Sequence, residues 1–254
     1  IMVSKKFGAA GNTVVVEEFL TGPEVSVLAF CDGTHLVPMV SAQDHKRALD
    51  NDQGLNTGGM GAFSPSKIYT PEVAATCMET IFMPTVRAMA AEGRPFVGCL
   101  YFGLMLTPDG MKVIEYNCRF GDPETQAVLP RLKSDLLTIM EACVDGTLDK
   151  TPVEWADEAA VCVVLASGGY PESYQKGYPI TGLAEAEARP HTLVFHAGTA
   201  QKDGQFVTNG GRVLGVVGLG KTMEEAIATA YAGADCIQFE KKHFRHDIGI
   251  KKNQ

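Results

Sequence analysis

The sequence has little positive charge. Its 254 residues include 22 lysines and arginines against 30 aspartates and glutamates, which gives a net charge of −8. A surface that binds the phosphate backbone of a nucleic acid needs a basic excess. We therefore expect no nucleic-acid partner. The apolar share of 45% is ordinary for a globular protein with a packed core.

Long apolar runs are also absent. No stretch reaches the roughly 20 residues that a membrane-spanning helix needs, and residues 1–6 are not followed by the apolar segment of a signal peptide. We predict no membrane partner and a cytoplasmic location. The first residue is isoleucine rather than methionine. We therefore expect that an N-terminal portion of the same protein is missing from this chain.

Paired cysteines are lacking. The seven cysteines are widely spaced, and none forms a Cys-x-x-Cys motif. This spacing argues against a disulfide framework and against a zinc site, and it favours free thiols in a reducing compartment. Cys162 lies in an apolar run and is interpreted as a packing residue. Cys118 has no histidine nearby in the sequence, and we interpret it in the same way.

The glycine-rich segment of residues 57–62 lacks the lysine of a Walker A loop, because no Gly-Lys-Ser/Thr follows it. It comes soon after Asp44-His45-Lys46-Arg47, which places three potential cations together in an acidic chain. Main-chain N–H groups of such a loop can converge on an anion. We interpret the two segments as a phosphate- or carboxylate-binding site, with a flexible surface loop as the alternative.

The most informative segment is residues 113–124, Val-Ile-Glu-Tyr-Asn-Cys-Arg-Phe-Gly-Asp-Pro-Glu. It begins as a strand, so Glu115 and Asn117 point to the same face about 7 Å apart at Cα. Two oxygen donors at this separation can hold a magnesium ion. Arg119 and Asp122 follow directly. The alternative interpretation is an ion pair at the end of a sheet, with Asp122 capping a helix.

The remaining pattern predicts an α+β fold in two parts. A polar stretch at 147–158 suggests a boundary between a region 1–156 and a β-rich domain 157–254. The second part has few clustered ionisable groups and is interpreted as a lid or a substrate wall. Strands are expected at 13–20, 25–30, 34–40, 98–106, 113–117, 159–166, 192–197 and 212–219, and helices at 70–93 with a break at Pro84, at 123–145, and at 222–235 with Thr222 and Glu225 as a capping box.

In this order, the motifs resemble those of the ATP-grasp ligases. Their residues are similar to those of the phosphoribosylamine–glycine ligase family. The resemblance implies an ATP-grasp fold, represented here by the C-terminal part of its nucleotide-binding subdomain and by its catalytic subdomain, followed by a small β-rich C-terminal domain. The matching segments cover nearly the whole chain and are residues 17–20 with Glu24, 43–47, 56–62, 115–126, 168–171, 195–199, 210–214 and 247–249.

The resemblance also implies how the nucleotide is held. The hinge of Glu17, Glu18, Phe19 and Leu20 would meet adenine through its backbone. Glu24 would bind the ribose hydroxyls. Glu115 and Asn117 would hold Mg²⁺, or Mn²⁺ in its place, against the phosphates of ATP.

The implied reaction uses ATP, glycine and 5-phosphoribosylamine. ATP would phosphorylate the glycine carboxylate, and the amine of 5-phosphoribosylamine would then displace phosphate. We assign Lys46 and Arg47 to phosphate contacts and Arg119 to the developing negative charge. Such a reaction mainly requires positioning and cations around an anionic transition state.

Two departures from the family pattern leave alternatives open. The strand at 100–106 has no acid, although many ATP-grasp enzymes carry one there, and the family's N-terminal substrate domain and phosphate-binding lysine are missing. We therefore expect no product from this chain alone, and an open sheet edge along residues 13–30. The alternatives are another purine-pathway ATP-grasp ligase, such as a carboxylase or a formate-dependent transformylase, and an ATP-binding fragment without catalysis.

Overall fold

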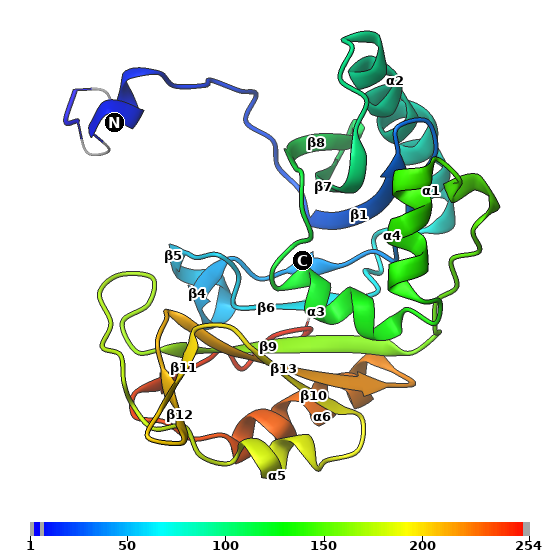
Figure 1. Ribbon diagram of the computed structural model, residues 1–254. Coiled ribbons are helices and arrows are strands. Elements are labelled where there is room, and N and C mark those ends of the chain that lie inside the picture. Colours follow the sequence, from blue (N-terminus) through cyan, green and yellow to red (C-terminus); the bar gives the residue numbers. More distant parts are fainter. Residues whose placement is uncertain (1–2, 6–7, 251–254) are drawn as a thin grey trace.

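The computed structural model describes residues 3–5 and 8–250, and within them two antiparallel sheets form two layers, with helices on their outer faces and also between them (Figure 1). The first sheet has the order β2-β1-β7-β8. Its strands are β1 (Glu24–Asp32), β2 (Leu36–Pro38), β7 (Val97–Thr107) and β8 (Gly110–Asn117).

The turns of the first sheet follow from local chemistry. Between β1 and β2, the Asp32 carboxylate accepts hydrogen bonds from the N–H groups of Thr34 (2.9 Å) and His35 (2.6 Å), and Gly33 has a φ of 94°. Such an Asx turn reverses the chain, and glycine adopts the positive φ at little cost. The predicted hairpin is confirmed, as is the hairpin that joins β7 to β8.

Both faces of the first sheet are covered, so β1 is buried along almost its whole length. On one face, Val27 and Phe102 belong to a core with the helical segment of residues 71–91. On the other face, Leu28 and Phe30 pack with α4 (Leu136–Asp145). The sheet is therefore a rigid base for the side chains at its strand ends.

The predicted helix at 70–93 is divided near Pro84, as expected. It consists of α1 (Pro71–Cys77), a π-helical turn (Met78–Phe82) and α2 (Met83–Ala91), and Thr70 caps its start by accepting a hydrogen bond from Val73 N (3.4 Å). Proline lacks the N–H that a continuous helix requires.

The helix predicted at 123–145 is broken as well, which was not expected. It forms α3 (Glu124–Val128), a 3₁₀ turn (Leu129–Arg131) and α4. Pro130 within the 3₁₀ turn accounts for the break. Asp135 caps α4 through Thr138 N (2.8 Å), and Gly146 ends it with a φ of 68°.

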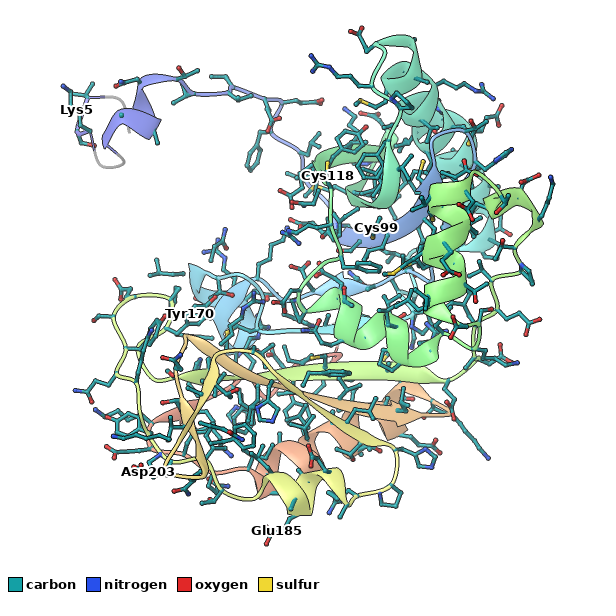
Figure 2. All side chains as sticks on the ribbon, in the orientation of Figure 1. Lys5, Cys99, Cys118, Tyr170, Glu185 and Asp203 are labelled. Atoms are coloured by element: carbon teal, nitrogen blue, oxygen red, sulfur yellow. The ribbon has the colours of Figure 1, made fainter. Side chains whose placement is uncertain are left out.

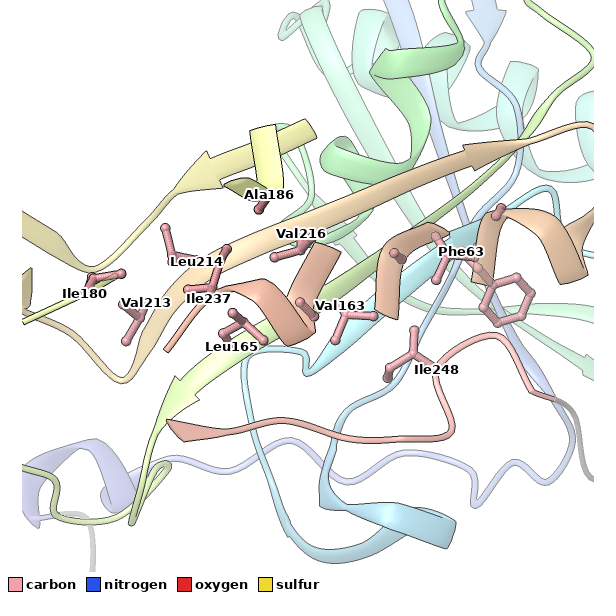
Figure 3. Close-up of a cluster of buried hydrophobic side chains, with 14 of the residues drawn as sticks. Phe63, Val163, Leu165, Ile180, Ala186, Val213, Leu214, Val216, Ile237 and Ile248 are labelled. Atoms are coloured by element: carbon pink, nitrogen blue, oxygen red, sulfur yellow. The ribbon is translucent and has the colours of Figure 1, made fainter. Parts of the chain in front are cut away.

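The second sheet has the path β10-β13-β9-β6-β3, and β14 pairs with β9. A hydrophobic core lies between one face of this sheet and the helices α6 (Met223–Cys236) and α5 (Leu183–Glu187). Figure 3 shows Val163, Leu165 and Ile237 packed together in this core. The strands are β3 (Gln43–Asp44), β6 (Gly61–Ser64), β9 (Ala159–Ser167), β10 (Thr192–His196), β13 (Arg212–Gly220) and β14 (Lys242–His243).

This second sheet contains strands from both predicted parts of the chain. Strands β3 and β6 precede residue 156, yet β6 pairs directly with β9, as in Gly61 with Val163. The boundary at 156 stays a prediction, and the sheet crosses it. Two small hairpins complete the strands: β4 (Arg47–Leu49) with β5 (Gln53–Asn56), and β11 (Thr199–Lys202) with β12 (Gln205–Thr208).

The strand predicted at residues 13–20 is wrong. This segment has no regular structure and runs outward from the first sheet (Figure 1), and β1 begins only at Glu24. Val15, Val16 and Phe19 are at least 83% exposed. A β-strand needs a partner for its backbone groups, and within residues 3–5 and 8–250 none pairs with this segment.

None of the helices in the described part of the chain is long and apolar enough to cross a membrane.

Candidate active site

A cavity of about 760 Å³ opens between the start of β1 and the C-terminal segment of the described chain. Its lining includes Glu24, Lys46 and Arg47, three residues that the sequence analysis predicted to contact the nucleotide. The loop that carries Lys46 and Arg47 is attached to β1, because Gln43 Nε2 donates to the Glu24 carbonyl oxygen (2.7 Å). Segments that are far apart in sequence therefore supply one polar cavity.

Glu24 and Lys46 form an ion pair on the cavity wall. Burial alone would lower the pKa of Lys46, but the carboxylates of Asp44, Glu24 and Glu115 outweigh it, so this pKa lies above its ordinary value. Lys46 is thus a permanent cation at neutral pH. The effect of Glu115 also shows that the end of β8 is near this wall.

His45 does not act as the third cation expected beside Lys46 and Arg47. Its pKa is lowered to about 4, first by burial and then by the charge of Arg245. The ring is therefore neutral at pH 7, and its Nε2 accepts a hydrogen bond from Gly249 N (3.3 Å). Arg47 is exposed, and its guanidinium donates to the Gly54 carbonyl oxygen (2.9 Å) within the β4–β5 hairpin.

Glu115, Asn117 and Arg119 lie together at the end of β8. Asn117 Nδ2 is 3.4 Å from Glu115 Oε1, and Arg119 Nη2 is 3.4 Å from Asn117 Oδ1. The same-face arrangement of Glu115 and Asn117 is therefore present. One carboxylate and one amide oxygen are hard donors that fit Mg²⁺, which retains water or phosphate oxygens as its other ligands.

Asp122 does not cap a helix, which was one alternative for this segment. Residue Pro123 precedes α3 without a side-chain cap. The Asp122 carboxylate instead pairs with Arg212 Nη2 (3.0 Å) and accepts from Gln126 Nε2 (3.0 Å). An ion pair at the end of the sheet does form, but its cation is Arg212 from β13 rather than Arg119.

None of the hinge residues 17–20 lines this cavity. Glu17 and Phe19 are exposed in the outward segment, and Leu20 is half-buried. Glu18 pairs with Lys112 Nζ (2.8 Å) on β8. The structure thus attaches the hinge to the edge of the first sheet through Glu18 and does not bring Glu17 or Phe19 into contact with Glu24.

The glycine-rich loop does not present free N–H groups to an anion, contrary to expectation. Thr57 N donates to the Lys46 carbonyl (2.7 Å), Gly58 N donates to the Tyr170 hydroxyl (3.0 Å), and Gly59 N donates to Thr57 Oγ1 (2.9 Å). Arg212 Nη1 further binds the Gly58 carbonyl oxygen (2.9 Å). The loop is a structural junction in which the glycines permit close packing.

Gly59 shows why glycine is needed in this junction. Its φ is +117°, and a Cβ there would lie 2.4 Å from Pro123 Cδ. The backbone of the loop thus approaches the segment after β8 more closely than any side chain would allow.

The C-terminal part was expected to hold few clustered ionisable groups, and this is wrong. The Arg245 side chain is fully buried, and its Nε and Nη2 each lie 2.8 Å from an oxygen of Asp247. Its Nη1 reaches Asp52 Oδ1 (2.9 Å) and the Arg47 carbonyl oxygen (3.1 Å). This network fixes the hairpin that carries Arg47.

Burial alone would raise the pKa of Asp247, but the hydrogen bonds from Arg245 and from the N–H of Asn51 outweigh it and lower the pKa to about 2. The segment 247–249 was noted in the sequence only as one of the matching motifs. The run Arg245-His246-Asp247, in which two basic side chains precede an acid, was the available signal for the network.

Sequence reasoning also missed two acids, Asp44 and Glu124. Asp44 lines the cavity, and its pKa is raised to about 7, first by burial and then by the nearby Glu124 carboxylate. Glu124 is 4% exposed and accepts hydrogen bonds from the hydroxyls of Tyr101 (2.9 Å) and Ser26 (3.2 Å). Both lie within motifs identified in the sequence, but the partial burial of Asp44 and the full burial of Glu124 depend on tertiary packing.

Cys118 is not a packing residue. It is exposed and lies near the end of β8, where Figure 2 labels it. With Tyr116 and Ile81 it lines an apolar cavity of about 520 Å³ beside α2. Cys162, by contrast, is fully buried, as predicted.

Comparison with known proteins gives matches over nearly the whole chain. Residues 1–125 match the model of the phosphoribosylglycinamide synthetase ATP-grasp (A) domain, and residues 160–251 match that of the C domain of the same synthetase. A phosphoribosylamine–glycine ligase from Synechocystis is 54% identical over 251 residues, which are 98% of this chain and 60% of the relative. The chain thus spans less than two thirds of that relative's length.

Solved structures agree with this. The crystal structure of a phosphoribosylamine–glycine ligase from Thermotoga maritima is 39% identical with a TM-score of 0.82, over 91% of this chain and 56% of that one. A biotin carboxylase from Campylobacter jejuni is 12% identical with a TM-score of 0.64, over 92% and 50%, and this likeness concerns the fold alone. The predicted α+β, ATP-grasp fold with a further C-terminal domain is confirmed.

Proposed function

The chain belongs to the phosphoribosylglycinamide synthetase family, and from this premise we propose that it carries catalytic machinery for the ATP-dependent ligation of glycine to 5-phosphoribosylamine. The products would be glycinamide ribonucleotide, ADP and phosphate. The observation that carries the proposal is the Glu24–Lys46 ion pair on the wall of one polar cavity, with the Glu115 carboxylate close enough to help raise the pKa of Lys46.

In this proposal, ATP lies along the wall that joins β1 to the end of β8. The backbone of residues 17–20 meets the adenine, and Glu24 accepts hydrogen bonds from the ribose hydroxyls. Because Glu24 is paired with Lys46, nucleotide binding must share or replace that contact. Lys46 is then free to turn toward the phosphates.

Glu115 and Asn117 would hold Mg²⁺, which neutralises charge on the phosphates when bound. The amide of Asn117 must present its oxygen to the ion, while Arg119 keeps a donor close to the same site. Strand β7 has no acid that could complete the donor set, so phosphate or water oxygens would supply the remaining ligands.

The proposed chemistry has two displacements. A glycine carboxylate oxygen attacks the γ-phosphorus of ATP, and ADP leaves. The amine of 5-phosphoribosylamine then attacks the acyl carbon, the C–O bond to phosphate breaks, and the amine loses a proton. Lys46, Arg47 and Arg119 stabilise negative charge on the oxygens involved, which is the main requirement of phosphoryl transfer.

The test is a chimera in which this chain replaces the matching 251 residues of the Synechocystis relative. With Mg²⁺, ATP, glycine and 5-phosphoribosylamine, the chimera is expected to form glycinamide ribonucleotide, detected by mass spectrometry. The 254-residue chain alone is measured in parallel, for which we expect nucleotide binding without product. A folded chimera that binds ATP and makes no product would favour an ATP-binding module instead.

Glu115→Gln tests the metal assignment in the isolated chain. An amide replaces the anionic ligand, so we expect Mg²⁺-dependent affinity for ATP to fall roughly tenfold or more. Glu185→Gln, on the exposed surface of α5, is the matched control. Equal affinities of Glu115→Gln and the unchanged chain for Mg²⁺–ATP, measured by titration calorimetry, would rule out Glu115 as the metal ligand.

A further inference from the structure

The charges around the cavity are mostly paired with one another. Four acids line it: Glu24, Asp44, Asp52 and Asp247. Glu24 is neutralised by Lys46, and both Asp52 and Asp247 are neutralised by Arg245. Asp44 is left as the only one of these four without an ion pair among the described residues.

The backbone around Asp44 is held firmly. Asp44 pairs with Ala62 in the β3–β6 ladder. Two residues earlier, Ala42 exchanges hydrogen bonds with Ser26 of β1 (2.8 and 2.9 Å). Asp44 therefore lies in the second sheet, two residues from a direct link to the first, and cannot easily move away from its acidic surroundings.

Those surroundings do not satisfy its charge. Behind it, Glu124 of α3 is already bound by two neutral hydroxyls. Beside it, Glu24 of β1 adds repulsion, and Lys46 attracts the carboxylate while paired to Glu24. Asp44 is half-buried, and a carboxylate partly removed from water among other acids is unfavourable unless a cation joins it.

We propose that Asp44 binds the ammonium group of the amino-acid substrate. This inference rests on the proposed function, in which that substrate is glycine. A primary ammonium carries one positive charge and three N–H donors, which suits a single unpaired carboxylate. Lys46, whose charge acts on Asp44, is suited to the carboxylate end of the same small molecule.

A divalent cation fits this position less well. Such ions collect several anionic oxygens, and here the Glu24 carboxylate is paired with Lys46 and Glu124 Oε1 accepts from two hydroxyls. Lys46 itself would also repel a second divalent charge.

The experiment measures glycine binding to the 254-residue chain by titration calorimetry at pH 8, with Mg²⁺–ADP present. Glycolate, which has a hydroxyl in place of the ammonium, is the comparison probe. We expect glycine to bind at least tenfold more tightly than glycolate, and Asp44→Asn to weaken glycine roughly ten- to a hundredfold. Glycolate affinity should change less than threefold in Asp44→Asn.

Asp203→Asn, in the exposed turn between β11 and β12, is the matched control and should bind glycine as the unchanged chain does. Asp44→Glu, which keeps the charge, should retain more glycine affinity than Asp44→Asn. Glycine affinity should also fall between pH 8 and pH 6 as Asp44 gains a proton, with Glu24, Lys46 and Glu124 facing it throughout.

Unchanged glycine affinity in a folded Asp44→Asn variant overturns the inference, as does a chain that binds Mg²⁺–ATP but no glycine. Binding of Mg²⁺ alone, without nucleotide, gives a further test. The inference is also overturned if Asp44→Asn loses more Mg²⁺ affinity than Glu115→Gln does. If the unchanged chain does not bind nucleotide, the proposed function is contradicted instead, because that measurement does not involve Asp44.

Discussion

At the scale of single residues, the raised pKa of Asp44 also predicts how stability depends on pH. Its pKa of about 7 lies above the ordinary value of 3.8, so the folded state holds an extra proton between these pH values. Stability therefore falls as pH rises through this window, and the full penalty is present above pH 7. Asp44→Asn should stabilise the protein at pH 8 by up to about 4 kcal/mol.

Urea denaturation at pH 8 and pH 4 measures this effect. At pH 4 the Asp44 carboxyl is protonated in the folded state, so Asp44→Asn and the unchanged chain should then differ little. A variant that is no more stable at pH 8 would show that the Asp44 charge is compensated.

Asp247 should behave in the opposite way. Its pKa of about 2 is below the ordinary 3.8, so its contribution to stability is present above pH 4 and is lost as pH falls toward 2. Asp247→Asn should cost about 2 kcal/mol at pH 7. Asp203→Asn should cost little. Urea midpoints at pH 7 and pH 3 decide the matter, since the difference between Asp247→Asn and the unchanged chain must shrink at the lower pH.

At the scale of elements, the cap of α6 gives a local test. Glu225 N donates to Thr222 Oγ1 (3.2 Å), and Lys221 N donates to Glu225 Oε2 (2.8 Å). Thr222→Ala should therefore destabilise the protein by about 1 kcal/mol. Thr229→Ala, in the middle of the same helix, is the control and should be neutral or slightly stabilising. If Thr222→Ala and Thr229→Ala lower the stability equally in thermal or urea denaturation, the cap makes no specific contribution.

Elements with strong local signals could be predicted from the sequence. The Asp32-Gly33 turn, the Thr70 and Thr222 caps and the long strands β7, β9 and β13 carry their determinants within a few residues. Residues 13–20 have the composition of a strand but no partner among the described residues. Strand composition alone cannot supply that partner.

The candidate site was predictable only in part, for a similar reason. The Glu115–Asn117 arrangement follows from strand geometry and needed no tertiary information. The neutral His45 and the raised pKa of Asp44 arise from burial by segments more than 70 residues away, such as Arg245 and Glu124. The occupied N–H groups of the glycine-rich loop likewise depend on Tyr170, on another part of the chain.

At the scale of the whole molecule, shared strands should make unfolding cooperative. Strand β6 precedes the predicted boundary and pairs with β9 beyond it, and Arg212 of β13 joins Gly58 to Asp122. We expect one urea transition. Trp155, the single tryptophan, packs in the core beneath the first sheet and reports on that layer by fluorescence.

Far-ultraviolet circular dichroism reports on both layers. The fluorescence and circular dichroism curves should therefore coincide within error. Separate midpoints would indicate two independently stable units and would support the boundary at residue 156 as a boundary of folding.

The pairing of β6 with β9 has a consequence for synthesis on the ribosome. The strand that contains Gly61 can pair with β9 only after Val163, about a hundred residues later, has been synthesised. At the usual speed of translation this delay is roughly 5–20 s, far longer than a hairpin needs to form. During that interval the nascent chain holds an unfinished sheet edge next to Met60 and Phe63, which are buried in the finished protein. Chaperone occupancy on stalled nascent chains should therefore decline once residues 159–167 have left the exit tunnel.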